Sequence, residues 1–357
     1  MSDLLERSIE IILNNQHPSG AFPASPVFPN YQYCWFRDSA FIAFALDLAG
    51  KHESASRFHD WAAHTVNKRA DIINRALEKT RDGIMPRSED ILHARYTLNS
   101  EDVEGVWPNF QLDGYGTWLW SVSEHLKITK KDPSPTWRQA MKLIAEYISA
   151  LWRYPCYDCW EEFPDRIHPY TLGAIYAGLK AEASISGSED AHEADLIKEV
   201  LFNQAIKDDH FIKHIGSDDV DASLLGLAVP YHLVEPEKPV MRNTVRFIEN
   251  TLRHGGGVHR YNSDTYYGGG EWILLTAWLG WYYAVIGERT KAKNLQEWIS
   301  AQADSQGYLA EQVPATLNDE KYYPIWRKRW GKIAKPLLWS HANYIILTHA
   351  IEGNIPK

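Results

Sequence analysis

The sequence predicts an all-α protein built as an (α/α)6 toroid, in which an inner ring of six helices is covered by six outer helices. Two kinds of helical segment alternate along the 357 residues. One kind is apolar on a single face, and the other is apolar on nearly every side, which is the pattern of a buried helix. Alternation of the two kinds favours a closed double ring, although periodicity alone leaves an irregular α-solenoid or bundle open.

The segments that are apolar on one face supply the outer helices. In the third of them, apolar residues recur at helical spacing from Met141 to Trp152, and Ser134 followed by Pro135 is a favourable helix start. The other five begin near Asp3, Glu53, Ser188, Lys238 and Glu288.

The segments that are apolar on all sides supply the inner helices. They are expected over residues 40–49, 115–122, 171–179, 222–229, 272–286 and 340–351. Gly50, Gly187 and Gly287 follow three of them, where a left-handed residue commonly ends a helix. Strand signals are short, at 93–98, 210–214 and 258–261, and predict small hairpins within loops.

Composition limits the classes of function. The net charge of −9 argues against a nucleic-acid partner, which requires a basic face, and gives no reason to expect a membrane partner. The longest nearly apolar run, Ile273 to Gly287, is shorter than the ~20 residues of a membrane span. Three cysteines, with a single C-x-x-C at Cys156 and Cys159, fit neither a disulfide framework nor a four-ligand zinc site.

The beginning of the sequence is charged where a signal peptide has an apolar core. We therefore expect a cytoplasmic protein in which residues 1–357 form a single catalytic domain. We expect neither a bound metal nor a cofactor, because no credible ligand cluster stands out in the sequence. The sequence is silent on the oligomeric state.

Polar residues gather in the segments that precede the inner helices. In a toroid these segments lie at one end of the ring and would line one funnel. They are residues 31–38, 107–114, 157–162, 218–221, 260–272 and 311–339. Most of them pair charged groups with aromatic rings, and several of the 15 tryptophans lie here, at Trp35, Trp107, Trp160, Trp272 and Trp339.

Each of these segments also has a purely structural interpretation. Asp38, Asp113 and Asp221 stand at helix starts, where aspartate is a favoured N-cap. Arg37 beside Asp38 could form a structural ion pair, and the Glu161–Glu162 pair could be a solvated loop. The coincidence of six such segments at one end weakens this interpretation.

Glycoside hydrolysis is the chemistry that fits these residue types. The reaction requires one carboxylic acid to protonate the glycosidic oxygen and a second carboxylate to act as base or nucleophile. Arginine and aspartate can hold sugar hydroxyls, and indole rings can stack on sugar rings. Gly-rich phosphate loops and a serine nucleophile elbow are missing from the sequence, and the acidic run at 218–221 lacks the second motif of a terpene cyclase.

The ordered set of motifs resembles glycoside hydrolase family 15, the glucoamylase family. Its first motif is similar to residues 29–40, its second to 107–114, its catalytic-acid loop to 160–162, its fourth loop to 260–272, and its catalytic-base region to 311–312 and 338–340. The resemblance runs from about residue 29 to 345. It implies an (α/α)6 fold and an inverting, exo-acting α-glucosidase.

The resemblance also implies roles for individual residues. Glu161 would be the general acid and Glu311 the general base. The remaining positions would bind substrate. Arg37 and Asp38 would grip the glucosyl unit, and Tyr31 would lie against it. Trp35 belongs to the same substrate-binding motif. Trp107 and Trp339 would shape the cleavage subsite, and the backbone near Trp160, with Glu162 and Arg260, would meet the aglycone side.

The sequence departs from the family by leaving no room for a β-sandwich or starch-binding domain. Short α-glucosides such as isomaltose or maltose therefore fit better than raw starch, and an α,α-trehalase of the same family stays open. A disaccharide phosphorylase and a non-catalytic sugar-binding toroid are alternatives of other classes. Glu161 and Glu311 precede the third and sixth inner helices, which lie opposite each other in a six-membered ring. This placement predicts the wide carboxylate gap of an inverting enzyme.

Overall fold

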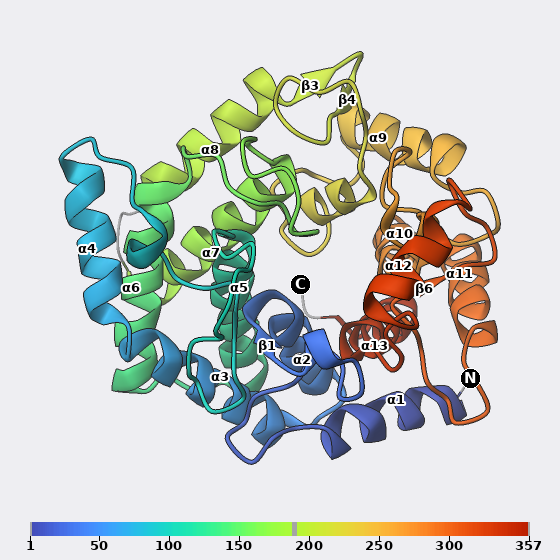
Figure 1. The fold of residues 1–357 in the computed structure, drawn as a ribbon, viewed down its shortest axis with the longest axis horizontal. Helices are drawn as coiled ribbons and strands as arrows, with labels where there is room; N and C mark the ends of the chain where they lie inside the picture. Colours follow the sequence, from blue (N-terminus) through green and yellow to red (C-terminus); the bar gives the residue numbers. More distant parts are fainter. Residues whose placement is uncertain (1, 188–190, 356–357) are drawn as a thin grey trace.

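Helices that are apolar on every side are stable only where every face is covered, and the structure places them at the centre (Figure 1). The computed structural model describes residues 2–187 and 191–355. Its inner ring consists of α2 (Phe36–Leu48), α5 (Asp113–Thr129), α7 (Pro169–Ser186), the 3₁₀ helix η3 (Ala222–Leu227), α10 (Ile273–Val285) and α13 (Leu338–Glu352). Each of these packs against the next, and α13 packs back against α2, so the ring is closed. The predicted all-α toroid is confirmed.

Amphipathic helices cover the ring with their apolar faces turned inward. They are α1 (Ser2–Asn14), α3 (His52–Asn67), α6 (Pro135–Leu151), α8 (Ala191–Gln204), α9 (Pro239–Thr251) and α11 (Arg289–Ala301). Ser134 caps α6 as predicted, because its side chain accepts a hydrogen bond from the backbone N–H of Trp137. The helix start expected near Ser188 lies outside the described residues.

One predicted inner helix differs in type. The α-helix expected over 222–229 is wrong, because η3 is a 3₁₀ helix that ends at Leu227. Pro230 explains the early end, since proline has no backbone N–H to donate and disfavours helical geometry in the residue before it. The two helices α4 (Ala70–Arg81) and α12 (Tyr322–Trp330) were not predicted.

Short strands and 3₁₀ turns connect the loops at the ends of the helices. The antiparallel pairs are β1 (Cys34–Trp35) with β2 (Arg95–Tyr96), β3 (Ile206–Lys207) with β4 (His210–Phe211), and β5 (Glu271–Trp272) with β6 (Gln312–Val313). The 3₁₀ turns are η1 (Pro29–Tyr31), η2 (Ser88–Asp90) and η4 (Tyr266–Gly268). All three segments with strand signals take part in pairing, although only β3–β4 is a local hairpin.

None of the described helices is both long and apolar enough to cross a lipid bilayer. The apolar run at 273–287 forms α10, a helix of 13 residues at the centre of the ring. Its hydrophobicity follows from burial on all sides.

Candidate active site

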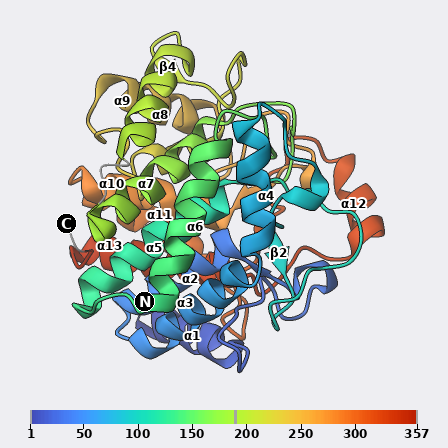
Figure 2. The same cartoon turned by 90° about the vertical axis from the view of Figure 1, so that its left-hand side faces the viewer.

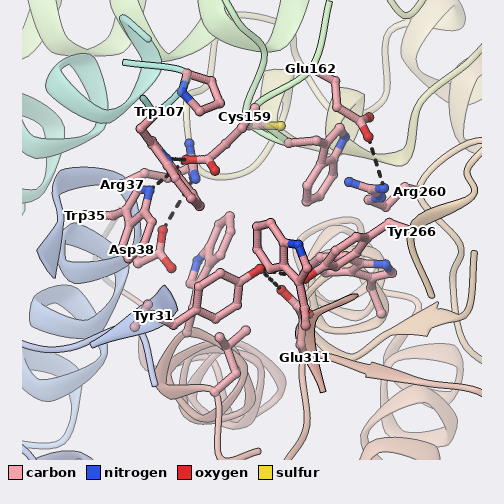
Figure 3. A pocket seen from close by; sticks show the side chains of 18 of the residues that line it. Tyr31, Trp35, Arg37, Asp38, Trp107, Cys159, Glu162, Arg260, Tyr266 and Glu311 are labelled. Atoms are coloured by element: carbon pink, nitrogen blue, oxygen red, sulfur yellow. Dashed lines mark hydrogen bonds and ion pairs between the residues drawn. The ribbon is translucent and has the colours of Figure 1, made fainter. Parts of the chain in front are cut away.

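The N-terminal ends of the inner helices open into one pocket of about 350 Å³. Five of the six polar segments contribute to its walls in the described part of the chain, and the sixth, at 218–221, lies behind them. The pocket brings together every residue that the sequence analysis proposed, namely Tyr31, Trp35, Arg37, Asp38, Trp107, Trp160, Glu161, Glu162, Arg260, Glu311 and Trp339. Figure 3 shows Trp35 and Trp107 on one side, Glu162 and Arg260 on another, and Glu311 beside Tyr31.

Arg37 and Asp38 extend from the first turn of α2 and are almost fully buried. The Arg37 guanidinium donates from Nη1 to Gln111 at 3.0 Å and to Asp113 at 3.1 Å, and its Nε lies 3.5 Å from Asp38 Oδ2. Among the described residues, neither Arg37 Nε nor Asp38 Oδ2 has a hydrogen-bond partner. Both atoms are buried with unused hydrogen-bonding capacity, and the two groups form the predicted ion pair. Burial raises the pKa of Asp38 to about 7 against the opposing effect of Arg37.

The N-cap interpretation holds for one of the three aspartates. Asp221 caps η3, because its side chain accepts from the backbone N–H of Ser223 at 2.8 Å. Asp113 is the first residue of α5 and Asp38 is the third residue of α2, so both lie inside the first turns of their helices. Negative charge in a first turn is still favoured by the helix dipole.

Glu161 receives a cluster of hydrogen-bond donors. Its Oε1 accepts from the indole N–H of Trp35 at 2.8 Å, from that of Trp107 at 3.0 Å and from the Gln111 amide at 3.0 Å. Glu161 also has a left-handed backbone with φ of +68°, a conformation that residues other than glycine rarely adopt. Such strain persists where surrounding contacts fix it, and it is typical of functional sites.

Asp158 holds the strained loop in shape. Its Oδ1 accepts backbone hydrogen bonds from Trp160 at 2.9 Å and from Glu162 at 2.8 Å. Behind the loop, the buried ammonium group of Lys213 lies 2.6 Å from Asp221 and 3.5 Å from Asp158. Asp221 in turn accepts the indole N–H of Trp160 at 3.0 Å. A buried network of charges thus positions the Glu161 loop.

Glu311 lies on the wall formed by the segment before α13. The β5–β6 pairing, with Trp272 opposite Gln312, fixes its backbone. Oε1 accepts a 2.9 Å hydrogen bond from the Tyr31 hydroxyl, whereas Oε2 has no hydrogen-bond partner among the residues that the structure describes. Burial raises the pKa of Glu311 to about 8, opposed by the Tyr31 hydrogen bond and by Arg260. A buried carboxylate with one free oxygen can accept a proton from water.

Arg260 and Glu162 form the next part of the wall. Arg260 donates to Asp264 at 2.7 Å and lies 3.6 Å from Glu162, while the Tyr261 hydroxyl donates to Glu162 at 2.5 Å. Burial raises the pKa of Glu162. The pair is held by neighbours on the protein side and can offer its remaining oxygens and N–H groups to a ligand.

Sequence reasoning missed several residues that complete the site. Gln111 and Tyr266 stood inside quoted motifs, and only their contacts reveal what they do. Arg95 stacks on Trp107, with its guanidinium carbon 3.4 Å from the ring centroid, but it comes from β2, which carries no motif. Trp326 and Trp330 of α12 also line the pocket. The available signal for them was two tryptophans four residues apart in a polar segment.

One further group in the described chain could hold a metal ion. Ligand atoms of Asp47, His59 and His125 lie within 4.8 Å of one another, and all three residues are buried. The His125 Nδ1 already lies 2.9 Å from both Asp47 oxygens, whereas His59 has no hydrogen-bond partner among the described residues. Asp47 lies ten residues beyond Arg37 on α2, about 15 Å along the axis, so this group is separate from the pocket.

The closed double ring and the pocket with its two carboxylates define a glycoside hydrolase. The chain matches the family model of glycosyl hydrolases family 15 over residues 2–349 and belongs to that family. It is 38% identical over 364 residues to the isomaltose glucohydrolase of Kribbella flavida, covering 100% of this chain and 94% of that protein. Trehalase 2 of Sulfolobus acidocaldarius is 26% identical, covering 89% of this chain and 60% of that enzyme.

Solved structures agree with this assignment. A wild-type glycosidase superimposes with a TM-score of 0.95 at 38% identity, covering 99% of this chain and 97% of that chain. A glycosidase variant in complex with glucose superimposes with the same TM-score, identity and coverage. A bacterial glucoamylase complexed with acarbose has a TM-score of 0.77 at 20% identity, covers 99% of this chain and 56% of that chain, and supports the fold alone.

Proposed function

We propose that this glycoside hydrolase is an inverting, exo-acting glucosidase that releases β-D-glucose from the non-reducing ends of short α-glucosides, with isomaltose as the preferred substrate. The observation that carries the proposal is the placement of Glu161 and Glu311 on one pocket, in loops that precede α7 and α13. These helices stand opposite each other in the packing order of the ring. Carboxylates that reach in from opposite walls leave space for a sugar and a water molecule, as inversion requires.

Glu161 is the general acid in this mechanism. It donates its proton to the glycosidic oxygen as the bond to the aglycone breaks. Trp35, Trp107 and Gln111 all bind Oε1, which leaves Oε2 to carry the proton toward the substrate. After transfer, the three N–H donors stabilise the carboxylate that forms.

Glu311 is the general base. Its free Oε2 accepts a proton from the water that attacks the anomeric carbon on the face opposite the departing oxygen. Tyr31 holds the other oxygen and thereby orients the carboxylate. The proton taken by Glu311 and the proton given by Glu161 balance, and the products are β-glucose and the released aglycone.

The remaining wall residues bind the substrate. Arg37 and Asp38 grip the hydroxyls of the glucosyl unit, and the Trp339 ring lies against this unit. The Arg37 guanidinium is 5.3 Å from the centroid of the Trp339 ring, so the two side chains support each other. Glu162 and Arg260 meet the sugar on the other side of the cleaved bond.

The three cysteines are free and buried, which is typical of a reducing compartment and supports a cytoplasmic location.

The test is a panel of isomaltose, maltose, panose and trehalose, with and without phosphate, assayed for free glucose. We expect the highest kcat/KM on isomaltose and no effect of phosphate. Preference for trehalose would replace the isomaltose assignment by that of a trehalase. Phosphate-dependent release of glucose 1-phosphate would contradict hydrolysis.

A further inference from the structure

The group formed by Asp47, His59 and His125 lies toward the end of the ring that is opposite to the pocket. Asp47 is in the last turn of α2, His125 is near the end of α5, and His59 is in the middle of α3. The three helices pack against one another in pairs, and Figure 2 shows them side by side. None of the three residues is more than 2% exposed. Their polar atoms therefore need partners within the protein or in a bound species.

His59 is the member of the group that packing alone does not explain. Neither of its ring nitrogens has a hydrogen-bond partner among the described residues, and the rings of Phe58 and Trp137 each lie 5.4 Å from its own. An apolar side chain would avoid the cost of these unpaired nitrogens. Burial, reinforced by the nearby His125, lowers the pKa of His59 well below its usual value, so the ring is neutral. A neutral imidazole has a free lone pair and is the form that binds a metal ion.

Asp47 and His125 are oriented by neighbours in the way that metal ligands usually are. His125 Nδ1 lies 2.9 Å from the Asp47 oxygens, and its Nε2 lies 2.9 Å from the Ser56 hydroxyl. His52 Nδ1 lies 2.9 Å from Asp47 Oδ1. A ligating imidazole commonly donates its second N–H to an oxygen, and a ligating carboxylate accepts an outer hydrogen bond. Ser56 and His52 are in these outer positions, and they leave one nitrogen and one oxygen for an ion.

The donor set selects the kind of ion. Two imidazoles and a carboxylate are typical ligands of Zn²⁺, whereas Mg²⁺ and Ca²⁺ prefer oxygen ligands. Tetrahedral zinc places its ligand atoms roughly 3.3 Å apart, and Asp47 and His125 are already close to this separation. The ligand atoms of the whole group lie within 4.8 Å of one another. The adjustment on binding therefore falls mainly on His59, which no hydrogen bond holds in the described structure.

We propose that Asp47, His59 and His125 bind one Zn²⁺ ion that bridges the outer helix α3 to the inner helices α2 and α5. The ion stabilises the ring and takes no part in the reaction at the pocket. This inference goes beyond the proposed function and does not depend on it. No ligand motif marks the three residues in the sequence, which is why we expected no metal there.

The test uses the full chain, stripped of metal with a chelator, incubated with zinc chloride and then dialysed. We expect elemental analysis to find one zinc per chain. Tm of the stripped protein should rise by about 3–5 °C when zinc is present at about 100 times its Kd. Magnesium chloride should leave Tm unchanged, because two of the three ligands are nitrogens.

His59→Leu removes one ligand and keeps a side chain of similar size. We expect this variant to retain no zinc and to show no rise of Tm with zinc. Without metal it should be at least as stable as the unchanged protein, because the unpaired buried nitrogens are gone. His64→Leu, the same substitution at an exposed position of α3, is the matched control and should retain both the zinc and the rise of Tm.

Two results would overturn the zinc site. Retention of one zinc by His59→Leu would place the ion elsewhere, and absence of bound zinc in the unchanged protein would leave no ion to place.

Cobalt provides the decision if His59→Leu does not fold. Co²⁺ bound to the unchanged protein by imidazoles and a carboxylate should show the visible absorption of a four-coordinate ion. A thiolate charge-transfer band would instead assign the ion to Cys156 and Cys159, and it would overturn the proposal, as would a spectrum without four-coordinate cobalt. None of these measurements uses a sugar substrate, so their outcome is independent of the glucosidase assignment.

Discussion

Tyr31 donates a hydrogen bond of 2.9 Å to Glu311, across 280 positions of the sequence. The hydroxyl of Tyr266 lies 2.9 Å from that of Tyr31, so two phenols in series end on one oxygen of the carboxylate. The other oxygen is buried and has no hydrogen-bond partner among the described residues. This arrangement fixes the direction in which Glu311 can take a proton, and it leads to the first two predictions.

Glu311→Ala should abolish turnover while substrate binding persists. A general base acts on the attacking water, so its loss is expected to lower kcat by at least ~10²-fold with little change in KM. Steady-state kinetics on isomaltose measures both constants. Glu297→Ala, at an exposed position on α11, is the control and should retain full activity. A kcat close to that of the unchanged enzyme would remove Glu311 from the mechanism.

Tyr31→Phe should move the acidic limb of the pH profile to higher pH. The base must be ionised, so kcat/KM falls as the pH drops below the pKa of Glu311, which burial raises to about 8. The Tyr31 hydrogen bond stabilises the ionised form and lowers this pKa, so its removal raises the pKa further. Tyr33→Phe is the control, since Tyr33 stacks under Arg95 outside the Glu311 contacts. A limb that stays in place, or moves to lower pH, would contradict this assignment.

Arg37→Lys should be damaging although it conserves the charge. The guanidinium contacts Gln111 and Asp113 from Nη1 and keeps Nε for a ligand, a fork that an ammonium group cannot reproduce. We expect kcat/KM to fall about 10- to 100-fold, the scale of one lost hydrogen bond to a charged group. Arg75→Lys, in an exposed ion pair with Asp71, serves for comparison. Equal kcat/KM for the Arg37→Lys variant and the unchanged enzyme would show that Arg37 does not touch the substrate.

Lys213→Met should destabilise the protein strongly. Removal of the buried ammonium leaves the carboxylates of Asp158 and Asp221 without their compensating charge. The expected loss in the free energy of unfolding is about 3–5 kcal/mol. Calorimetry measures it as a lower Tm, and Lys207→Met, in an exposed ion pair with Asp218, should change Tm little. Equal Tm values for the two variants would show that the network does not contribute to stability.

The first glucose released should be the β-anomer. Water that attacks opposite the departing oxygen inverts the configuration of an α-glucoside. Proton NMR during the first minutes, before mutarotation, distinguishes the two anomers. An initial α-anomer signal would identify a retaining enzyme and would require a different second carboxylate.

Helical periodicity predicts the double ring because burial dictates it. The inner helices are apolar all round, and a closed ring covered by outer helices is one arrangement that buries every face. Periodicity does not predict helices that are mostly exposed. Helix α12 has no buried residue, and the only buried residues of α4 are Ile73 and Ala76. Periodicity also fails at 222–229, where the apolar pattern of a buried helix is interrupted by Pro230.

The candidate site divides in the same way. Glu161 and Glu311 lie in segments that pair charge with aromatic rings, and the resemblance of these segments to the family's motifs singles them out. Lys213 does not stand out, because its partners Asp158 and Asp221 meet it only in the folded chain. The left-handed backbone of Glu161 could not be predicted either, because no sequence pattern identifies a residue other than glycine with positive φ. The roles of the wall residues stay predictions until the variants are measured.

Closure of the ring has a consequence for how the enzyme is made. The contact of α13 with α1 and α2 joins segments as distant as Ser8 and His341, which are 333 positions apart and hydrogen-bonded at 2.9 Å. We expect contacts between such distant segments to form late in folding, because closing a long loop costs chain entropy before the contact stabilises the fold. A nascent chain without α13 therefore has an open arc of helices with an apolar flank toward water. We expect the complete sugar pocket to form only when α13 closes the ring, because Trp339 of α13 is part of its wall.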